Sequence, residues 1–405
     1  MSGRPTLGIG IVGAGTMAAA HGLALRLIGP LFPELPVHPR IIAVADVNQR
    51  LATTLAERYE IERVEPDWRR LVEADDIDVV VACLPPIANH EVVLGAAAAG
   101  KHIVCEKPLA ETAERAQELL DACRAAGVFH GLGAGYRWAP ALRAIRAMLD
   151  RGELGEVRSL RASFMLDYAA DPDVPLLWRF QRSLSGGGLA IDTGYHLVDC
   201  ARFLVGEIDS VQALTRTFIT ERPLPDADAI GNRGGAAGTA ATRTRAPVDV
   251  EDAAAFLVTF PTGAYGVLET SRIAIGKRVA LEIDLFGSRG SAAWDLERPD
   301  EFRVCLPGDL SSFGYRRVLV NASHPGAVLA AGTDGTSFGW LGQQVAMWAE
   351  FLTAIAEGRS AHADFEDGVR TNAVIDALYA AAETGARTPV VLPGRLDKTM
   401  QAASA

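Results

Sequence analysis

Positive charge, cysteine and long apolar runs are all scarce in this sequence. Its 405 residues contain 39 Lys and Arg against 50 Asp and Glu, which gives a net charge of −11. Nucleic acids and anionic membrane surfaces both bind through basic patches, so we expect neither as a partner. No apolar run approaches the ~18 residues needed to span a bilayer.

The cysteines exclude two classes of small stabilised domain. There are five of them, an odd number, none forms a C-x-x-C pair and none pairs with a nearby histidine, which argues against a disulfide scaffold and a zinc knuckle. We therefore expect no metal site and a reducing, cytoplasmic location. The first residues carry one Arg and no small-residue cleavage site, so we expect a strand there and not a signal peptide.

Strand and helix patterns alternate over the first 130 residues. This alternation predicts βαβ units and a mainly parallel sheet. The predicted strands are Leu7–Val12, Ile41–Ala45, Asp78–Cys83, His102–Cys105 and Val128–Leu132. The predicted helices are Thr16–Ile28, Gln49–Tyr59, Asn89–Ala99 and Thr112–Ala126.

The pattern changes near residue 139. Consecutive strands without intervening helices predict an antiparallel or mixed sheet, and hence a different second domain. Its predicted strands are Val157–Leu166, Val211–Ile219, Ala253–Phe260, Tyr265–Arg272 and Val279–Phe286, with a hairpin at Pro-Thr-Gly. Its predicted helices are Pro140–Asp150, Gln343–Glu357 and Asp367–Thr384. We divide the chain into residues 1–134 and 135–405, and the last helices can pack back on the first domain.

Two segments interrupt these patterns. Gly29–Arg40 has a proline at every third residue, which predicts a stiff polyproline II loop in preference to a peptide-binding segment. Leu224–Val248 is rich in Ala, Gly and Thr, and we expect a long flexible loop.

A glycine turn joins the first predicted strand to the first helix. Gly13, Gly15 and Ala18 form the pattern G-x-G-x-x-A, in which Gly13 permits the tight turn and Gly15 lets a pyrophosphate approach the helix N-terminus. Asp46 ends the second predicted strand, where a carboxylate accepts the ribose hydroxyls of NAD and repels the phosphate of NADP. The alternatives are a purely steric need for glycine and a turn-capping Asp46.

Lys107 follows another predicted strand, within Glu106-Lys-Pro108. Ligands of open α/β sheets bind outside the carboxyl ends of the strands, so this ammonium is placed to bind a substrate oxygen. An exposed Glu106–Lys107 pair before a proline turn is the equal alternative.

A glycine run precedes an acid and a histidine. Three glycines at 186–188 lead to Asp192 and His196, whose i, i+4 spacing puts them on one helical face. A histidine suits proton transfer near neutrality, and a nearby carboxylate fixes its tautomer. The glycines allow close packing on something flat, such as a nicotinamide ring or another backbone. A helix-start Asp with a core histidine and, less favoured, a metal pair are the alternatives.

Together these motifs resemble the Gfo/Idh/MocA family of oxidoreductases. The resemblance is carried by Ala98–Leu109, Gly135–Pro140, Trp178–Phe180, Gly186–Asp199 and Asp364–Gly368. It implies an N-terminal Rossmann domain and a C-terminal α/β domain with a large, mainly antiparallel open sheet, on which a homo-oligomer, dimer or tetramer, is built. It also implies NAD as cofactor, Lys107, Asp192 and His196 as the catalytic set, and a cis bond at Lys107–Pro108. Position 89 is Asn where many relatives have His, and position 135 is Gly where Asn is frequent.

The expected contacts fall into two groups. Cofactor contacts are expected from Gly13, Gly15, Thr16, Met17, Asp46, Leu84, Pro86, Asn89, Glu106 and Lys107. Substrate contacts are expected from Lys107, Tyr136, Arg137, Trp178, Arg179, Asp192 and His196, with interior packing as the alternative for Trp178.

The function implied is an NAD-dependent dehydrogenase acting on a secondary hydroxyl of a sugar, sugar derivative or cyclitol. His196 would take the hydroxyl proton, Asp192 would stabilise the imidazolium, and Lys107 would orient the oxygen. One alternative is NAD-dependent glycoside cleavage through transient oxidation and elimination. The other is a non-catalytic regulator that senses NAD or a sugar, which the retention of all three residues argues against.

Overall fold

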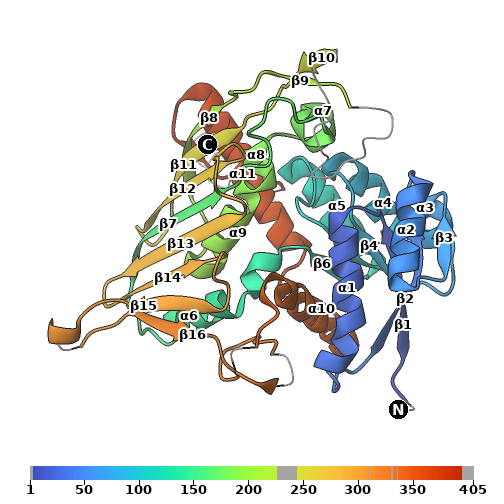
Figure 1. Cartoon of the computed structure of the whole chain (residues 1–405), viewed down its shortest axis with the longest axis horizontal. Coiled ribbons are helices and arrows are strands. Elements are labelled where there is room, and N and C mark those ends of the chain that lie inside the picture. The colour runs from blue at the N-terminus through green and yellow to red at the C-terminus, as the bar shows by residue number, and fades with distance from the viewer. Residues whose placement is uncertain (1–2, 226–243, 309, 330–331, 335, 395–405) are drawn as a thin grey trace, which may run out of the picture.

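The computed structural model describes residues 3–225, 244–308, 310–329, 332–334 and 336–394, and its first half is built on a parallel sheet (Figure 1). Six strands pair in the order β3-β2-β1-β4-β5-β6, and every pair is parallel. The strands are β1 (Thr6–Val12), β2 (His38–Ala45), β3 (Arg63–Glu65), β4 (Val79–Ala82), β5 (His102–Cys105) and β6 (His130–Leu132). The Rossmann prediction is confirmed, and the order reverses between β1 and β4, where such sheets bind ligands.

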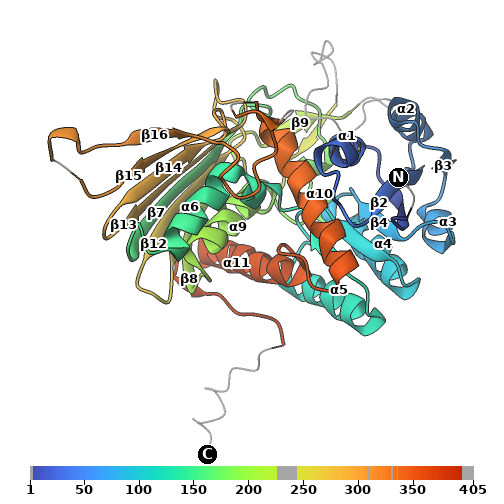
Figure 2. The ribbon, with the colours of Figure 1, turned by 90° about the horizontal axis from the view of Figure 1, so that it is seen from below.

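Five helices cover this sheet. They are α1 (Thr16–Leu31), α2 (Gln49–Tyr59), α3 (Trp68–Glu73), α4 (Pro86–Ala98) and α5 (Ala113–Ala126). Figure 2 shows α1 and α2 on the opposite side of the sheet from α4 and α5. Neither β3 nor α3 was predicted, because three and six residues are too few to show a repeating pattern of a strand or a helix.

The predicted polyproline loop at Gly29–Arg40 is wrong. Pro30 lies in the last turn of α1, and Pro39 lies inside β2. Pro39 is tolerated because β3 pairs only with residues 43–45 of β2, which leaves the start of β2 as an edge.

The second sheet has nine strands in the order β16-β15-β14-β13-β7-β12-β11-β8-β17. Only β7 and β12 pair in parallel, so the predicted large, mainly antiparallel sheet is confirmed, as is the β11–β12 hairpin. The strands are β7 (Val157–Met165), β8 (Ser210–Arg216), β11 (Ala253–Thr259), β12 (Tyr265–Ser271), β13 (Ala280–Gly287), β14 (Ser291–Asp295), β15 (Glu301–Cys305), β16 (Arg316–Leu319) and β17 (Thr388–Pro389).

Helices cover one face of this sheet. Figure 2 shows α6 (Pro140–Asp150), α9 (Gly194–Val205) and α11 (Phe365–Thr384) on that face, while the described helices leave the other face open. Two late helices also contact the first half of the chain, since α10 (Gly339–Glu357) packs on α1 and α11 packs on α5. None of the described helices combines the length and hydropathy that crossing a membrane requires.

Short elements surround the junction of the two halves. They are η1 (Gly135–Trp138), η2 (Trp178–Phe180), α7 (Arg182–Ser185), α8 (Leu189–Asp192), β9 (Glu221–Pro223), β10 (Arg245–Pro247) and η4 (Leu310–Ser312). The expected flexible loop at 224–248 falls largely on residues 226–243, which lie outside the described residues, and β9 pairs with β10 at its ends.

Candidate active site

A cavity of about 230 Å³ opens at the carboxyl ends of β1, β4 and β5, facing the second half of the chain. Both groups of predicted site residues reach it. Its lining includes Gly15, Thr16, Met17, Leu84, Pro86, Glu106, Lys107, Tyr136, Trp178, Arg179, Asp192 and His196. Most of the predicted contacts are therefore brought together from the two halves of the chain.

The glycine turn has room for a phosphate group. Gly13 has φ +94°, and a Cβ there would lie 2.5 Å from the Cys83 carbonyl oxygen, so this turn requires glycine. A Cβ at Gly15 would meet no described atom within 4 Å. Gly15 is the N-cap of α1, and no side chain among the described residues caps this helix. These residues fit the pyrophosphate of a dinucleotide.

Asp46 holds this turn against the end of β2. Its Oδ2 accepts from the Ala14 backbone N–H at 2.7 Å, and its Oδ1 accepts from that of Asn48 at 2.7 Å. The turn-capping alternative is therefore present in the structure. It is compatible with a cofactor contact, because the carboxylate stays partly exposed beside the glycine turn.

Lys107 is bound to Asp192 across the cavity. Its peptide bond with Pro108 is cis, as predicted. Its Nζ donates to Asp192 Oδ1 at 2.7 Å and to the Asp192 carbonyl at 2.8 Å. Arg179 Nε lies 3.7 Å from the other oxygen, Oδ2. The alternative of an exposed Glu106–Lys107 pair is wrong, because Glu106 is only 4% exposed.

The predicted single helix through Asp192 and His196 is wrong. Asp192 ends α8, and His196 lies in the first turn of α9. In a continuous helix the His196 N–H would donate to the Asp192 carbonyl. Here it donates to the Thr193 carbonyl at 3.1 Å, and Lys107 takes the Asp192 carbonyl. The His196 ring packs edge-on against Tyr136, with centroids 4.6 Å apart.

Neighbouring side chains and backbone leave no room for a Cβ at Gly187 or Gly188 in the glycine run. A Cβ at Gly187 would lie 2.1 Å from the Tyr379 hydroxyl, and one at Gly188 would lie 2.5 Å from the Glu251 carbonyl. The Glu251 carboxylate accepts from the N–H groups of Gly188 at 3.2 Å and Ala190 at 2.9 Å. Glu251 thus fixes the start of the short helix that carries Asp192, and no nicotinamide is needed to explain the glycines.

Trp178 and Arg179 are held in the wall by the residue that follows them. Phe180 is fully buried, and two guanidinium groups lie over its ring, those of Arg222 at 4.2 Å and Arg272 at 4.5 Å from the ring centroid. Arg272 also donates to the Arg179 carbonyl at 3.1 Å. The Arg179 guanidinium lies over the Trp178 ring at 4.1 Å. Interior packing is wrong for Trp178, because its ring lines the cavity.

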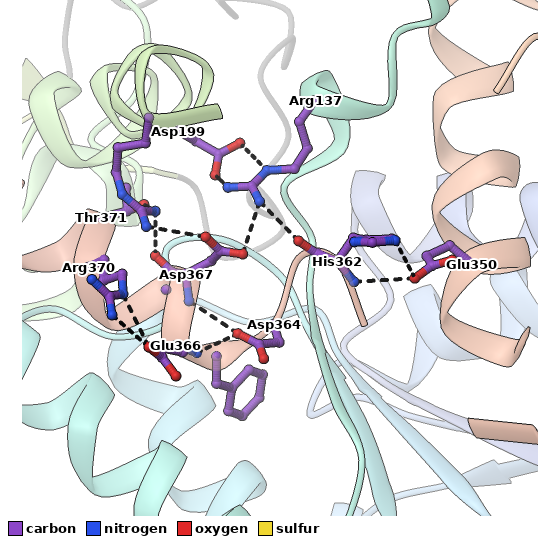
Figure 3. A network of polar contacts seen from close by, with 12 residues as sticks. Arg137, Asp199, Glu350, His362, Asp364, Glu366, Asp367, Arg370 and Thr371 are labelled. Carbon is purple, nitrogen blue, oxygen red and sulfur yellow. Dashed lines mark hydrogen bonds and ion pairs between the residues drawn. The ribbon is translucent and has the colours of Figure 1, made fainter. Parts of the chain in front are cut away.

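Arg137 does not line the cavity, which corrects its predicted substrate contact. Figure 3 shows its guanidinium between Asp199 and Asp367. Its Nε donates to Asp199 Oδ2 at 3.0 Å and its Nη1 to Asp367 Oδ2 at 2.9 Å. Burial disfavours the guanidinium charge, but these carboxylates outweigh burial and raise the pKa of Arg137. The residue joins α9 and α11 and holds its neighbour Tyr136 beside His196.

Asn89 is the second correction. Its side chain is fully buried, lies outside the cavity lining, and accepts from the Leu84 N–H at 3.3 Å. It is therefore placed to shape the loop after β4, and burial keeps its side chain from a cofactor.

Sequence reasoning missed Gln344. This residue of α10 lines the cavity and is 2% exposed, and its Oε1 has no hydrogen-bond partner among the described residues. A Cβ at Gly135 would lie 2.4 Å from its Nε2, so glycine at 135 makes room for this amide. The departure from the usual Asn at position 135 was the available signal. Phe164, Ile191, Thr193 and Trp340 also line the cavity and were missed.

Comparisons with known proteins agree with this geometry. Residues 7–134 match the family model described as oxidoreductase family, NAD-binding Rossmann fold, and residues 142–293 match the GFO/IDH/MocA C-terminal domain. Levoglucosan dehydrogenase from Pseudarthrobacter phenanthrenivorans is 35% identical over 379 residues, which cover 93% of this chain and 96% of that protein. Myo-inositol 2-dehydrogenase from Thermotoga maritima is 26% identical over 309 residues, 76% of this chain and 80% of that one. A solved structure of levoglucosan dehydrogenase with NADH and levoglucosan has a TM-score of 0.86 at 32% identity, covering 95% of this chain and 99% of that chain.

Proposed function

Since this chain belongs to the Gfo/Idh/MocA family of NAD-binding oxidoreductases, we propose that it oxidises a secondary hydroxyl of a sugar, sugar derivative or cyclitol with NAD. Residues 1–134 would bind the cofactor, and residues 135–405 would bind the substrate. The observation that carries the proposal is the convergence of Lys107, Asp192 and His196 on one cavity beside an open glycine turn.

The residues divide the chemistry between them. NAD⁺, when bound, supplies the hydride acceptor. His196 takes the hydroxyl proton as general base, and Tyr136 fixes the plane of its ring. Lys107 donates a hydrogen bond to the same oxygen and eases the build-up of negative charge on it. Asp192 holds the Lys107 ammonium in place and, as the sequence predicts, stabilises the imidazolium that forms on His196.

The cavity wall supports a compact neutral sugar as substrate. Trp178 offers an aromatic face to sugar C–H groups, Arg179 offers several N–H donors, and Gln344 offers a buried acceptor. Because the sequence is 35% identical to a levoglucosan dehydrogenase, a 1,6-anhydrosugar such as levoglucosan heads the candidates.

The test follows NADH absorbance with purified protein, NAD⁺ and a panel of levoglucosan, inositols, glucosides and aldoses. We expect NADH to form with at least one of them and a much weaker signal with NADP⁺, because Asp46 repels the extra phosphate. Release of an aglycone without net NADH would identify glycoside cleavage instead. Absence of turnover across the panel, in protein shown to bind NAD⁺, would contradict the proposal.

The open face of the nine-stranded sheet is the interface we propose for a homo-oligomer. Leu214, Leu257 and Tyr265 are about half exposed there, at 50%, 48% and 54%, and Leu257 pairs directly with Val267 across β11 and β12. Light scattering after gel filtration should give a dimer or tetramer, and Leu257→Glu should yield a monomer.

The proposed compartment is the cytoplasm, because all five cysteines are free thiols.

A further inference from the structure

A buried hydrogen-bonded chain runs from α10 through α1 to the cavity. Trp348 Nε1 lies 2.9 Å from His21 Nδ1, and His21 Nε2 lies 3.0 Å from Glu106 Oε1. Trp348 and His21 are fully buried, and Glu106 is 4% exposed. Glu106 alone of the three lines the cavity, and the proposed mechanism leaves it without a role.

The geometry fixes the charge of the histidine. An indole N–H only donates, so His21 Nδ1 accepts from Trp348 and carries no proton. The ring proton is therefore on Nε2, which donates to Glu106, and His21 is neutral. The contact between His21 and Glu106 is a hydrogen bond and not an ion pair.

The other donor to this carboxylate is also uncharged. The backbone N–H of Lys107 donates to Glu106 Oε2 at 3.2 Å, whereas the Lys107 ammonium donates to Asp192. Neutral hydrogen-bond donors thus hold a carboxylate that is almost fully buried at the wall of the cavity. A cation entering such a cavity gains more from the carboxylate than it would in bulk solvent.

We propose that Glu106 makes the site discriminate between the two redox states of the cofactor, binding NAD⁺ in preference to NADH. The oxidised nicotinamide ring carries a positive charge that the reduced ring lacks. The carboxylate therefore stabilises bound NAD⁺ and gives no such stabilisation to bound NADH. His21 and Trp348 preserve this effect, because a neutral His21 does not cancel the negative charge. The proposal rests on the proposed NAD site and names what one of its residues selects.

The experiment measures the dissociation constants of NAD⁺ and NADH by titration calorimetry, without substrate, in the wild type and three variants. In Glu106→Gln, which keeps the shape and removes the charge, the ratio Kd(NADH)/Kd(NAD⁺) should fall about tenfold or more. Glu106→Asp keeps the charge and should retain the preference. Glu350→Gln is the control, because that carboxylate of α10 pairs with Arg359 at 2.7 Å outside the cavity lining, and its ratio should match the wild type.

The outcomes separate this inference from the proposed function. An unchanged ratio in folded Glu106→Gln would overturn the inference and leave the dehydrogenase intact. Failure of the wild type to bind either cofactor would overturn the proposed function. If circular dichroism shows that Glu106→Gln does not fold, Glu106→Met takes its place. This variant replaces the carboxylate with an uncharged, apolar side chain of similar length, and the same ratio of dissociation constants is measured.

Discussion

The Lys107 ammonium donates to both the carboxylate and the backbone carbonyl of Asp192, at 2.7 and 2.8 Å. One bond pairs the charges, and the other replaces the helical bond that would have joined α8 to α9. The two residues are thus coupled in position as well as in charge. Loss of Lys107 should remove the hydrogen-bond donor to the substrate oxygen. It should also disturb the start of α9, the helix that carries His196.

The first prediction concerns this pair. Lys107→Met should lower kcat/KM by about 10²–10⁴-fold, the range for a well-placed group that acts on the reacting oxygen. Asp192→Asn, which still offers Lys107 an acceptor oxygen, should cost less. Initial rates with NAD⁺ and the best substrate measure both effects. Full turnover by Lys107→Met would contradict the assigned role.

The second prediction concerns Gln344. Its Oε1, which has no hydrogen-bond partner in the part of the chain that the structure describes, should accept a hydrogen bond from a substrate hydroxyl. Gln344→Ala should therefore raise KM about 3–10-fold with little change in kcat. Gln343→Ala is a matched control, because Gln343 is equally buried, at 1% exposed, and does not line the cavity. Equal effects of the two substitutions on KM would assign Gln344 a packing role only.

The third prediction concerns the buried ion pairs of Figure 3. Arg137→Gln leaves Asp199 buried without its cation and should lower the free energy of unfolding by about 3–5 kcal/mol. Arg370→Gln breaks a partly exposed pair with Glu366 and should cost about 1 kcal/mol or less. Urea unfolding measures both. A cost for Arg137→Gln no greater than that for Arg370→Gln would contradict the account of Arg137 as a buried structural cation.

Local patterns were enough to predict five of the six strands of the first sheet and the glycine turn at the cavity. The strand, glycine turn and helix at residues 7–28 are adjacent in the chain, and the carboxyl ends of parallel strands necessarily share one edge of a sheet. The strands β14, β15 and β16 were missed because they have four or five residues each, too few to show a clear alternation.

The two main errors in the predicted site have the same cause: each depends on a contact with residues that are distant in the sequence. At the break between α8 and α9 the Asp192 carbonyl accepts from Lys107, which lies 85 residues earlier in the chain. Arg137 does not reach the substrate cavity because it donates to Asp199 and Asp367, which lie 62 and 230 residues away in the sequence. Nothing in the residues around Arg137 indicates which carboxylates the fold brings to it.

The last prediction concerns pH and His130. Burial, with the nearby charge of Arg124 adding to it, lowers the pKa of His130 to about 4 in the folded chain. Its ring stacks on Phe365 at 4.9 Å, and its Nδ1 accepts from the Phe365 N–H at 3.2 Å. In the unfolded chain the pKa returns to about 6.5. Between these values the unfolded state binds a proton that the folded state does not, so stability is lost as pH falls from about 6.5 towards 4.

Substitution of His130 should remove this dependence. Between pH 7.0 and 5.5 the wild type should lose about 1 kcal/mol more of its free energy of unfolding than His130→Gln does. The range stops above the ordinary pKa values of Asp and Glu, so carboxylate protonation contributes little to the difference. Urea unfolding at the two pH values gives the four numbers required. Equal losses in the two proteins would mean that the folded chain protonates His130 as readily as the unfolded chain, and that burial against Phe365 does not exclude the proton.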